Sequence, residues 1–158
     1  MIELVEKLVQ KLAEMEMTIS TAESCTGGML ASKIIDVSGA SEVFSEGFIT
    51  YSNNAKAKYL NVKNETLETF SAVSEETVKE MAEGCQMATG SDMAIVTSGI
   101  AGPGGGTPEK PVGLVYIACA YKGDVISKCF KFDGDRYEIR SQAVDESIKM
   151  AVEMLENH

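Results

Sequence analysis

Residues 18–37 read TISTAESCTGGMLASKIIDV and contain the turn on which the fold depends. The first part, residues 18–22, is short and rich in β-branched side chains, which favours a strand. The polar, glycine-containing segment 23–28 then interrupts it, and apolar residues return at helical spacing up to about Val37. Thr26 occupies the position of a helix N-cap. The stretch therefore predicts a strand, a turn and a helix, which is the building unit of an α/β protein.

The remainder of the chain extends this alternation of helices and strands. Apolar residues at steps of three and four predict an amphipathic helix from Ile2 to Met15. Asn53, Ser74 and Asp135 mark the starts of three later helices. Further strands are expected at residues 47–51, 92–98, 112–121 and 125–132.

These strands define the predicted sheet. The run Met93-Ala94-Ile95-Val96 is continuously apolar, as in a parallel sheet that helices cover on both faces. Lys122-Gly123-Asp124 joins the last two strands at the spacing of an antiparallel hairpin. No internal repeat or linker is evident, so one domain over residues 1–158 is expected. The predicted fold class is α/β, a three-layer α/β/α sandwich whose mixed sheet is mostly parallel with an antiparallel hairpin at one edge.

The composition argues against several classes of function. A formal net charge of −10 disfavours a nucleic-acid partner, because binding to the phosphate backbone needs clustered Lys and Arg side chains. No apolar run approaches the roughly 20 residues of a bilayer span, so no membrane partner is expected. The four cysteines form no C-x-x-C pair and no signal-peptide pattern precedes them, which predicts reduced thiols and a cytoplasmic protein.

The only histidine, His158, is the last residue, where chain ends are usually loose. A Ser-His-Asp triad, a Cys-His pair or a histidine-rich metal site would need an imidazole in the core. Lysine is the alternative base, since partial burial lowers the pKa of its amine towards neutrality. Cys25 has no internal histidine to form its thiolate, so a packing role is expected for it.

Candidate partners for such a lysine follow several of the predicted strands. No lysine has a serine three residues before it, so any Ser-Lys pair must be assembled in space. Ser24, Ser41 and Ser98 each lie in or beside a loop of the kind where α/β proteins gather ligand sites. Tyr51 and Lys56 flank the turn at residues 52–54 and can approach the edge of one pocket. The opposing interpretation is that these side chains cap helices, anchor packing and face solvent.

The segment 99–107, GIAGPGGGT, is the most distinctive in the chain. It matches neither G-x-G-x-x-G nor a P-loop, which excludes dinucleotide and nucleoside-triphosphate sites of those types. Its glycines allow backbone amides to approach an anion closely, although a flexible connector has the same composition. Arg136 follows Gly134-Asp135 at a predicted helix start, where it suits either a phosphate or a turn and helix cap.

Six ordered blocks resemble the CinA C-terminal domain family across nearly the whole chain. The first three are residues 21–28 (TAESCTGG), residues 47–53 (GFITYSN) with Ala55-Lys56, and residues 72–75 (AVSE). The others are residues 98–103 (SGIAGP), 110–113 (KPVG) and 134–136 (GDR). Longer family members carry an additional N-terminal domain resembling molybdopterin-binding proteins. Nothing in this sequence corresponds to that domain, so its pyrophosphatase-type activity is not expected.

The resemblance implies hydrolysis of nicotinamide mononucleotide to nicotinic acid mononucleotide and ammonia in pyridine nucleotide salvage, with no metal and no cofactor. It implies Ser41 as nucleophile, Lys56 as general base and Tyr51 as a hydrogen-bonding partner in proton transfer, with Ser24 supporting the same site. The resemblance also implies substrate contacts from Thr26, Gly27, Ser98, Gly99, Gly102 and Arg136, with Arg136 at the phosphate. Backbone amides of either the 24–28 turn or the 99–102 loop would form the oxyanion hole.

Two other functions compete with the amidohydrolase. A non-catalytic nucleotide-binding regulatory module, or sensor, would retain the glycine loop and Arg136 without needing an unprotonated lysine. A DNA-associated competence factor would bind DNA with steep salt dependence, which the net charge makes the weakest of the three hypotheses. A homo-oligomer that pairs through a helix or an edge strand is also expected.

Overall fold

The strand, turn and helix predicted from residues 18–37 lie at the centre of the protein. In the computed structural model, which describes residues 1–158, β1 (Ile19–Glu23) is buried along its whole length and leads through the turn into α2 (Met29–Ile35). β1 pairs in parallel with β2 (Phe44–Ile49) on one side and with β3 (Met93–Gly99) on the other. The carboxyl ends of these three strands consequently lie at the same edge of the sheet.

An antiparallel hairpin completes the five-stranded sheet. β4 (Leu114–Tyr121) pairs antiparallel with β3, and β5 (Asp124–Lys131) pairs antiparallel with β4, giving the order β2-β1-β3-β4-β5. Four strands therefore point the same way and only β4 runs against them. This confirms the mostly parallel mixed sheet with an antiparallel hairpin at one edge.

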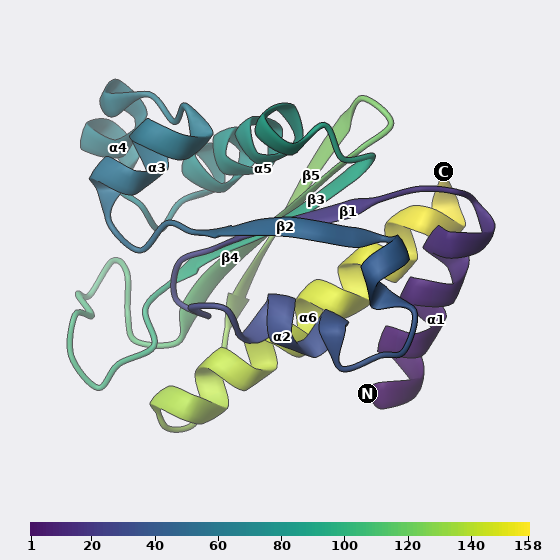
Figure 1. Cartoon of the computed structure of the whole chain (residues 1–158). Helices are drawn as coiled ribbons and strands as arrows, with labels where there is room; N and C mark the ends of the chain where they lie inside the picture. Colours follow the sequence, from purple (N-terminus) through teal and green to yellow (C-terminus); the bar gives the residue numbers. More distant parts are fainter.

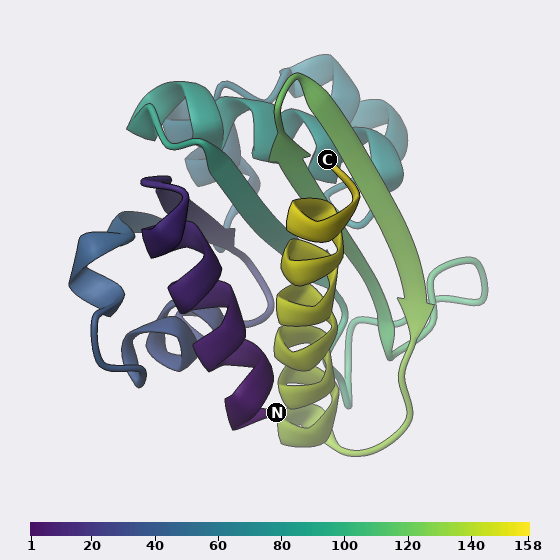
Figure 2. The same cartoon turned by 90° about the vertical axis from the view of Figure 1, so that its right-hand side faces the viewer.

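Helices cover both faces of this sheet (Figures 1 and 2). One face carries α1 (Ile2–Glu14), α2 and the long α6 (Arg136–Asn157), and Figure 2 shows α1 and α6 side by side on it. The other face carries α5 (Glu75–Thr89), with α3 (Asn53–Leu60) and α4 (Asn64–Phe70) beside it. Two separate apolar clusters, of 26 and 12 buried residues, fill the layers between helices and sheet.

Three local features of the structure differ from the predictions. Thr26 does not cap α2, which begins only at Met29. The buried Glu23 carboxylate instead accepts hydrogen bonds from the backbone amides of Leu30 and Ala31. The second strand begins at Phe44 rather than residue 47, and a 3-10 turn, η1 (Ala40–Glu42), precedes it. The helix α4 was not predicted because its seven residues bury only Thr66 and Leu67, which is too few for a periodic pattern.

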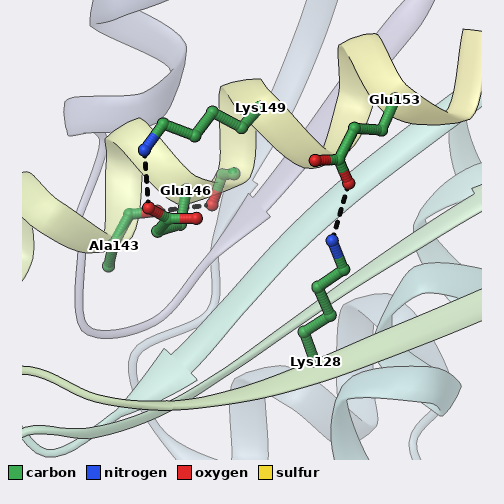
Figure 3. A network of polar contacts seen from close by, with 6 residues as sticks. Lys128, Ala143, Glu146, Lys149 and Glu153 are labelled. Atoms are coloured by element: carbon green, nitrogen blue, oxygen red, sulfur yellow. Dashed lines mark hydrogen bonds and ion pairs between the residues drawn. The ribbon is translucent and has the colours of Figure 1, made fainter. Parts of the chain in front are cut away.

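Helix α6 is held along the sheet so that its first turn lies beside the edge where β1, β2 and β3 end. Asp135 and Glu138 form a reciprocal capping box at its start. Further along, Lys128 of β5 pairs with Glu153 of α6 at 2.6 Å, and Lys149 pairs with Glu146 within the helix (Figure 3). These exposed ion pairs add little stability, so apolar burial dominates the contact. No helix of the protein, α6 included, is long and apolar enough to cross a membrane.

Candidate active site

A cavity of about 260 Å³ opens where the carboxyl ends of β1, β2 and β3 meet. The turn after β1, the segment after β2, the end of β3 and the first turn of α6 each contribute side chains to it. The loop between β3 and β4, which projects from the sheet in Figure 1, forms one wall. The residues that line the cavity include Ser24, Cys25, Tyr51, Lys56, Ser98, Gly99, Gly102 and Arg136.

Lys56 carries the most unusual group in this cavity. It lies in α3, its side chain is only 1% exposed, and its Nζ lies 2.9 Å from Ser24 Oγ. The same nitrogen donates to the carbonyl oxygens of Thr50 at 2.7 Å and Tyr51 at 3.4 Å. Burial lowers the pKa of Lys56 from 10.5 to about 8, and the nearby Cys25 thiol opposes this only in part. No carboxylate is paired with the amine to offset this, and with a pKa of about 8 about a tenth of it is neutral at pH 7.

The three partners of Lys56 suit a neutral amine as well as an ammonium. A neutral amine has two hydrogens and one lone pair. The Thr50 and Tyr51 carbonyls can only accept, so they take the hydrogens. The Ser24 hydroxyl can donate, so the lone pair is left facing its proton. This is the geometry that a general base and a serine nucleophile would need.

Ser24 is held in place by the residue before it. The Ser24 amide donates to the Thr97 carbonyl at 3.1 Å, which fixes the start of the turn to β3. The carboxylate of Glu23 is fully buried and accepts from Leu30 N, Ala31 N and Thr26 Oγ1. Because these donors come from the turn and from the start of α2, Glu23 fixes the path of the chain on both sides of the Ser24 hydroxyl.

Tyr51 and Arg136 bridge the mouth of the cavity. Arg136 donates from Nη2 to the Tyr51 hydroxyl at 3.1 Å and from Nη1 to the Gly102 carbonyl at 2.8 Å. The Tyr51 side chain is 64% exposed, so its hydroxyl lies at the rim while its backbone carbonyl contacts Lys56. A guanidinium at this rim is suited to an anionic group of a ligand.

Cys25 lines the same cavity, but its thiol is unsuited to nucleophilic attack. Burial raises the pKa of the Cys25 thiol to about 11. The hydrogen bonds of Cys25 and the charge of Lys56 lower this pKa, but by less than burial raises it. The thiolate is therefore scarce near neutral pH. This is consistent with the packing role expected from the absence of an internal histidine.

Comparison with known proteins identifies the family. The family profile described as the CinA C-terminal domain matches residues 1–155. The chain belongs to this family. It is 55% identical over 138 residues to the CinA-like protein of Kosmotoga olearia, which covers 87% of this chain and 34% of that protein. The chain thus spans about a third of the length of that curated relative.

Solved structures of CinA proteins share the whole fold of this CinA C-terminal domain. The competence/damage inducible protein CihA from Agrobacterium tumefaciens superposes with a TM-score of 0.95 at 40% identity, covering 98% of this chain and 94% of that one. A competence-damaged protein (CinA) superfamily protein from Klebsiella pneumoniae also gives 0.95, at 36% identity and with 99% and 98% covered.

Three of the predicted site residues of the CinA domain lie outside the cavity. Ser41 is exposed in η1, before the amino end of β2, whereas Ser24 and Lys56 lie at the carboxyl end, so the structure does not bring Ser41 and Lys56 together as predicted. Thr26 is buried and its hydroxyl contacts Glu23 and Thr97. Gly27 faces a separate surface depression beside Tyr137. The remaining predicted residues are brought together around Lys56, as the cavity lining shows.

Sequence reasoning missed several residues that shape the CinA site. Ala72 and Val73 line the cavity, and Ser98 Oγ donates to the Ala72 carbonyl at 2.8 Å. Arg140 donates to the carbonyls of Cys25 and Thr26, one helical turn after Arg136 on the same helix. That four-residue spacing was the only signal in the sequence for Arg140. Nowhere in the chain do three or more His, Cys, Asp or Glu side chains converge as metal ligands would.

Proposed function

We propose that this CinA domain is an amidohydrolase that converts nicotinamide mononucleotide to nicotinic acid mononucleotide and ammonia. The observation that carries the proposal is the buried Lys56 amine, 2.9 Å from the Ser24 hydroxyl and without a carboxylate partner. A structural lysine gains nothing from such a position, because burying an unpaired ammonium costs free energy. A base that must be neutral to work requires it.

The first step forms a covalent ester. The Lys56 lone pair takes the Ser24 proton while Ser24 Oγ attacks the carboxamide carbon, and the carbonyl oxygen becomes negative. The Ala101 and Gly102 amides, in the loop that lines the cavity, donate to no other acceptor of the chain and are free to stabilise this oxygen. Lys56 then returns the proton to the amide nitrogen, the carbon–nitrogen bond breaks, and ammonia leaves.

The second step regenerates the serine. Lys56, neutral again, takes a proton from a water molecule that attacks the ester carbon. Collapse of the intermediate breaks the bond to Ser24 Oγ, which recovers a proton from Lys56, and the acid that forms gives its remaining proton to solvent and departs as the carboxylate. In this scheme Arg136 and the glycine loop hold the phosphate and ribose, and Tyr51 orients the ligand at the rim.

Ammonia release from pure protein and nicotinamide mononucleotide tests the proposal. Ser24→Ala and Lys56→Met should each lower kcat by about 10²–10⁴-fold, the usual contribution of such groups. The wild-type rate should rise with pH up to the Lys56 pKa of about 8, because only the neutral amine accepts a proton. Ser41→Ala is the matched control and should retain activity, because Ser41 is remote from the cavity.

The competing hypotheses predict different results in the same experiment. A nucleotide-binding regulatory module would bind the mononucleotide, measured by calorimetry, and release no ammonia in any variant. Full activity in Ser24→Ala would reject Ser24 as the nucleophile. Absence of ammonia from folded wild-type protein, with or without added divalent metal, would reject the amidohydrolase itself.

A further inference from the structure

Two segments that are distant in sequence form adjoining parts of the cavity wall. One is the turn at residues 70–73, between α4 and α5, which contributes Ala72 and Val73. The other is the loop at residues 100–113, between β3 and β4, which contributes Gly102, Gly104 and Gly105. The base of this loop is fixed by backbone hydrogen bonds of Ile100 with Leu114 and Gly113. Its middle part, residues 103–109, is exposed and makes no such bond to the rest of the chain.

Lys110 joins these two segments. Its Nζ donates to the carbonyl oxygens of Phe70 at 2.5 Å and Val73 at 2.7 Å, and to Ser71 Oγ at 2.7 Å. An ammonium has three hydrogens, and the turn presents three acceptors to it. None of them is a carboxylate, so the contact depends on the geometry of the turn rather than on a charge pair. Because all three hydrogens are used by the protein, Lys110 has none left for a ligand phosphate.

Only one other polar side-chain contact ties the same loop to the rest of the protein. This is the hydrogen bond from Arg136 Nη1 to the Gly102 carbonyl. In the proposed function Arg136 turns towards a phosphate, which competes with that hydrogen bond. While substrate is bound, the hydrogen bonds of Lys110 are then the polar side-chain contacts that still hold the loop to the rest of the protein.

We propose that Lys110 is a positioning residue that sets the width of the nucleotide pocket by holding the 100–113 loop against the 70–73 turn. The substrate assignment within this inference rests on the proposed function, whereas the tie itself does not. Lys110 touches neither Ser24 nor Lys56, so it acts on binding and not on proton transfer. Its loss should weaken ground-state binding and leave the chemical step nearly unchanged.

The first test needs no substrate. Proteinase K should cut the 100–113 loop of Lys110→Met at least about tenfold faster than that of wild-type protein, because cleavage follows the population of the open segment. Mass spectrometry locates the cut. Lys63→Met is the matched control, since the Lys63 amine is exposed and contacts no side chain or carbonyl. Equal cleavage of this loop in Lys110→Met and wild type would overturn the proposal.

The second test measures kinetics with nicotinamide mononucleotide. Lys110→Met should raise KM about tenfold with kcat within about threefold, and the pH dependence set by Lys56 should not move. Ser71→Gly removes one acceptor, keeps a residue suited to the φ of +68° at this position, and should raise KM by a smaller factor. A loss of kcat at unchanged KM would overturn the positioning role. If wild-type protein is inactive, the proposed function fails, and the proteolysis result still decides whether Lys110 holds the loop.

Discussion

Lys56 has, in a single residue, the environment that a general base needs where no internal histidine is available. It is the only buried lysine of the chain, and its partners are two carbonyls and a hydroxyl. A carboxylate in their place would stabilise the ammonium and hold the pKa of Lys56 at or above its ordinary value. Neutral acceptors satisfy the hydrogens of the amine and still leave burial to lower that pKa.

The lowered pKa of Lys56 predicts a pH-dependent stability. Folded protein releases this proton near pH 8, whereas the unfolded chain holds it up to the ordinary value of 10.5. Between these values unfolding takes up a proton, so the free energy of unfolding rises with pH through this group. At about 1.36 kcal/mol per pKa unit, the gain approaches about 3 kcal/mol by pH 10.5. Well below pH 8 the group is charged in both states and contributes no slope.

Urea denaturation of wild-type protein and Lys56→Met at pH 7 and pH 10 measures this gain. The unfolding free energy of wild type minus that of Lys56→Met should be larger at pH 10 than at pH 7, because only wild type has the Lys56 amine. The contributions of all other titrating groups are the same in both proteins and cancel in this difference. Lys63→Met, which removes an exposed amine, should track wild type at both values. A Lys56→Met difference that stays constant with pH would mean that the Lys56 amine is not desolvated in the folded protein.

The partner of Lys56 could not be chosen from the sequence. Excluding histidine left lysine as the base, and the spacing to Tyr51 placed Lys56 near a pocket. Ser24 and Ser41 both lay in plausible loops, and only the parallel pairing of β1 with β2 brings Ser24 and Lys56 to one edge while leaving Ser41 at the other. A choice that depends on strand register has no local signal.

At the scale of elements, the position of Lys56 depends on how closely α3 packs against α5. A methyl group added at Gly84 of α5 would lie 1.7 Å from the carbonyl oxygen of Leu60, at the end of α3. A backbone oxygen cannot rotate away as a side chain can, so the helices would have to separate. Glycine is needed here for close approach, although it is a poor helix former.

Gly84→Ala is therefore expected to destabilise the protein by about 1–3 kcal/mol, despite the better helix propensity of alanine. Because α3 carries Lys56, ammonia release should fall as well. Thermal unfolding and the activity assay measure the two effects. Glu83→Ala, at the exposed neighbouring position of the same helix, should change stability by less than about 0.5 kcal/mol. Stabilisation by Gly84→Ala would contradict the close packing.

Helices and strands could be predicted from the sequence where a continuous or periodic run of residues is buried. They were poorly predicted where few residues are buried. The apolar run at Met93 predicted β3 to within a residue, and Ser74 marks the start of α5 as expected. The helix α2 is shorter than expected because its capping group is the side chain of Glu23, seven residues before Leu30. A cap that comes from so far back in the sequence lies outside the local patterns that mark helix starts.

At the scale of the whole molecule, positive charge is scarce and forms no extended basic surface. The chain has 14 basic and 24 acidic side chains, and four of the basic ones lie in the cavity or bond to its wall: Lys56, Lys110, Arg136 and Arg140. Their donors are directed at carbonyls and hydroxyls in and around the cavity and not at an extended surface. Of the four, only Arg136 lies at the rim of the cavity, where its guanidinium can meet one small anionic ligand.

The same distribution predicts that the domain does not bind DNA by its phosphate backbone. A protein that neutralises several phosphates loses affinity steeply with salt, with a slope of about −0.9 per contact in a double-logarithmic plot. Fluorescence anisotropy with a labelled duplex should show no saturable binding by this domain at 50 mM salt, even at about 10⁻⁵ M protein, where basic non-specific binders are engaged. A basic DNA-binding protein in the same titration controls for the probe. Saturable binding with a steep salt slope would require a basic surface that a net charge of −10 and this arrangement of cations do not provide.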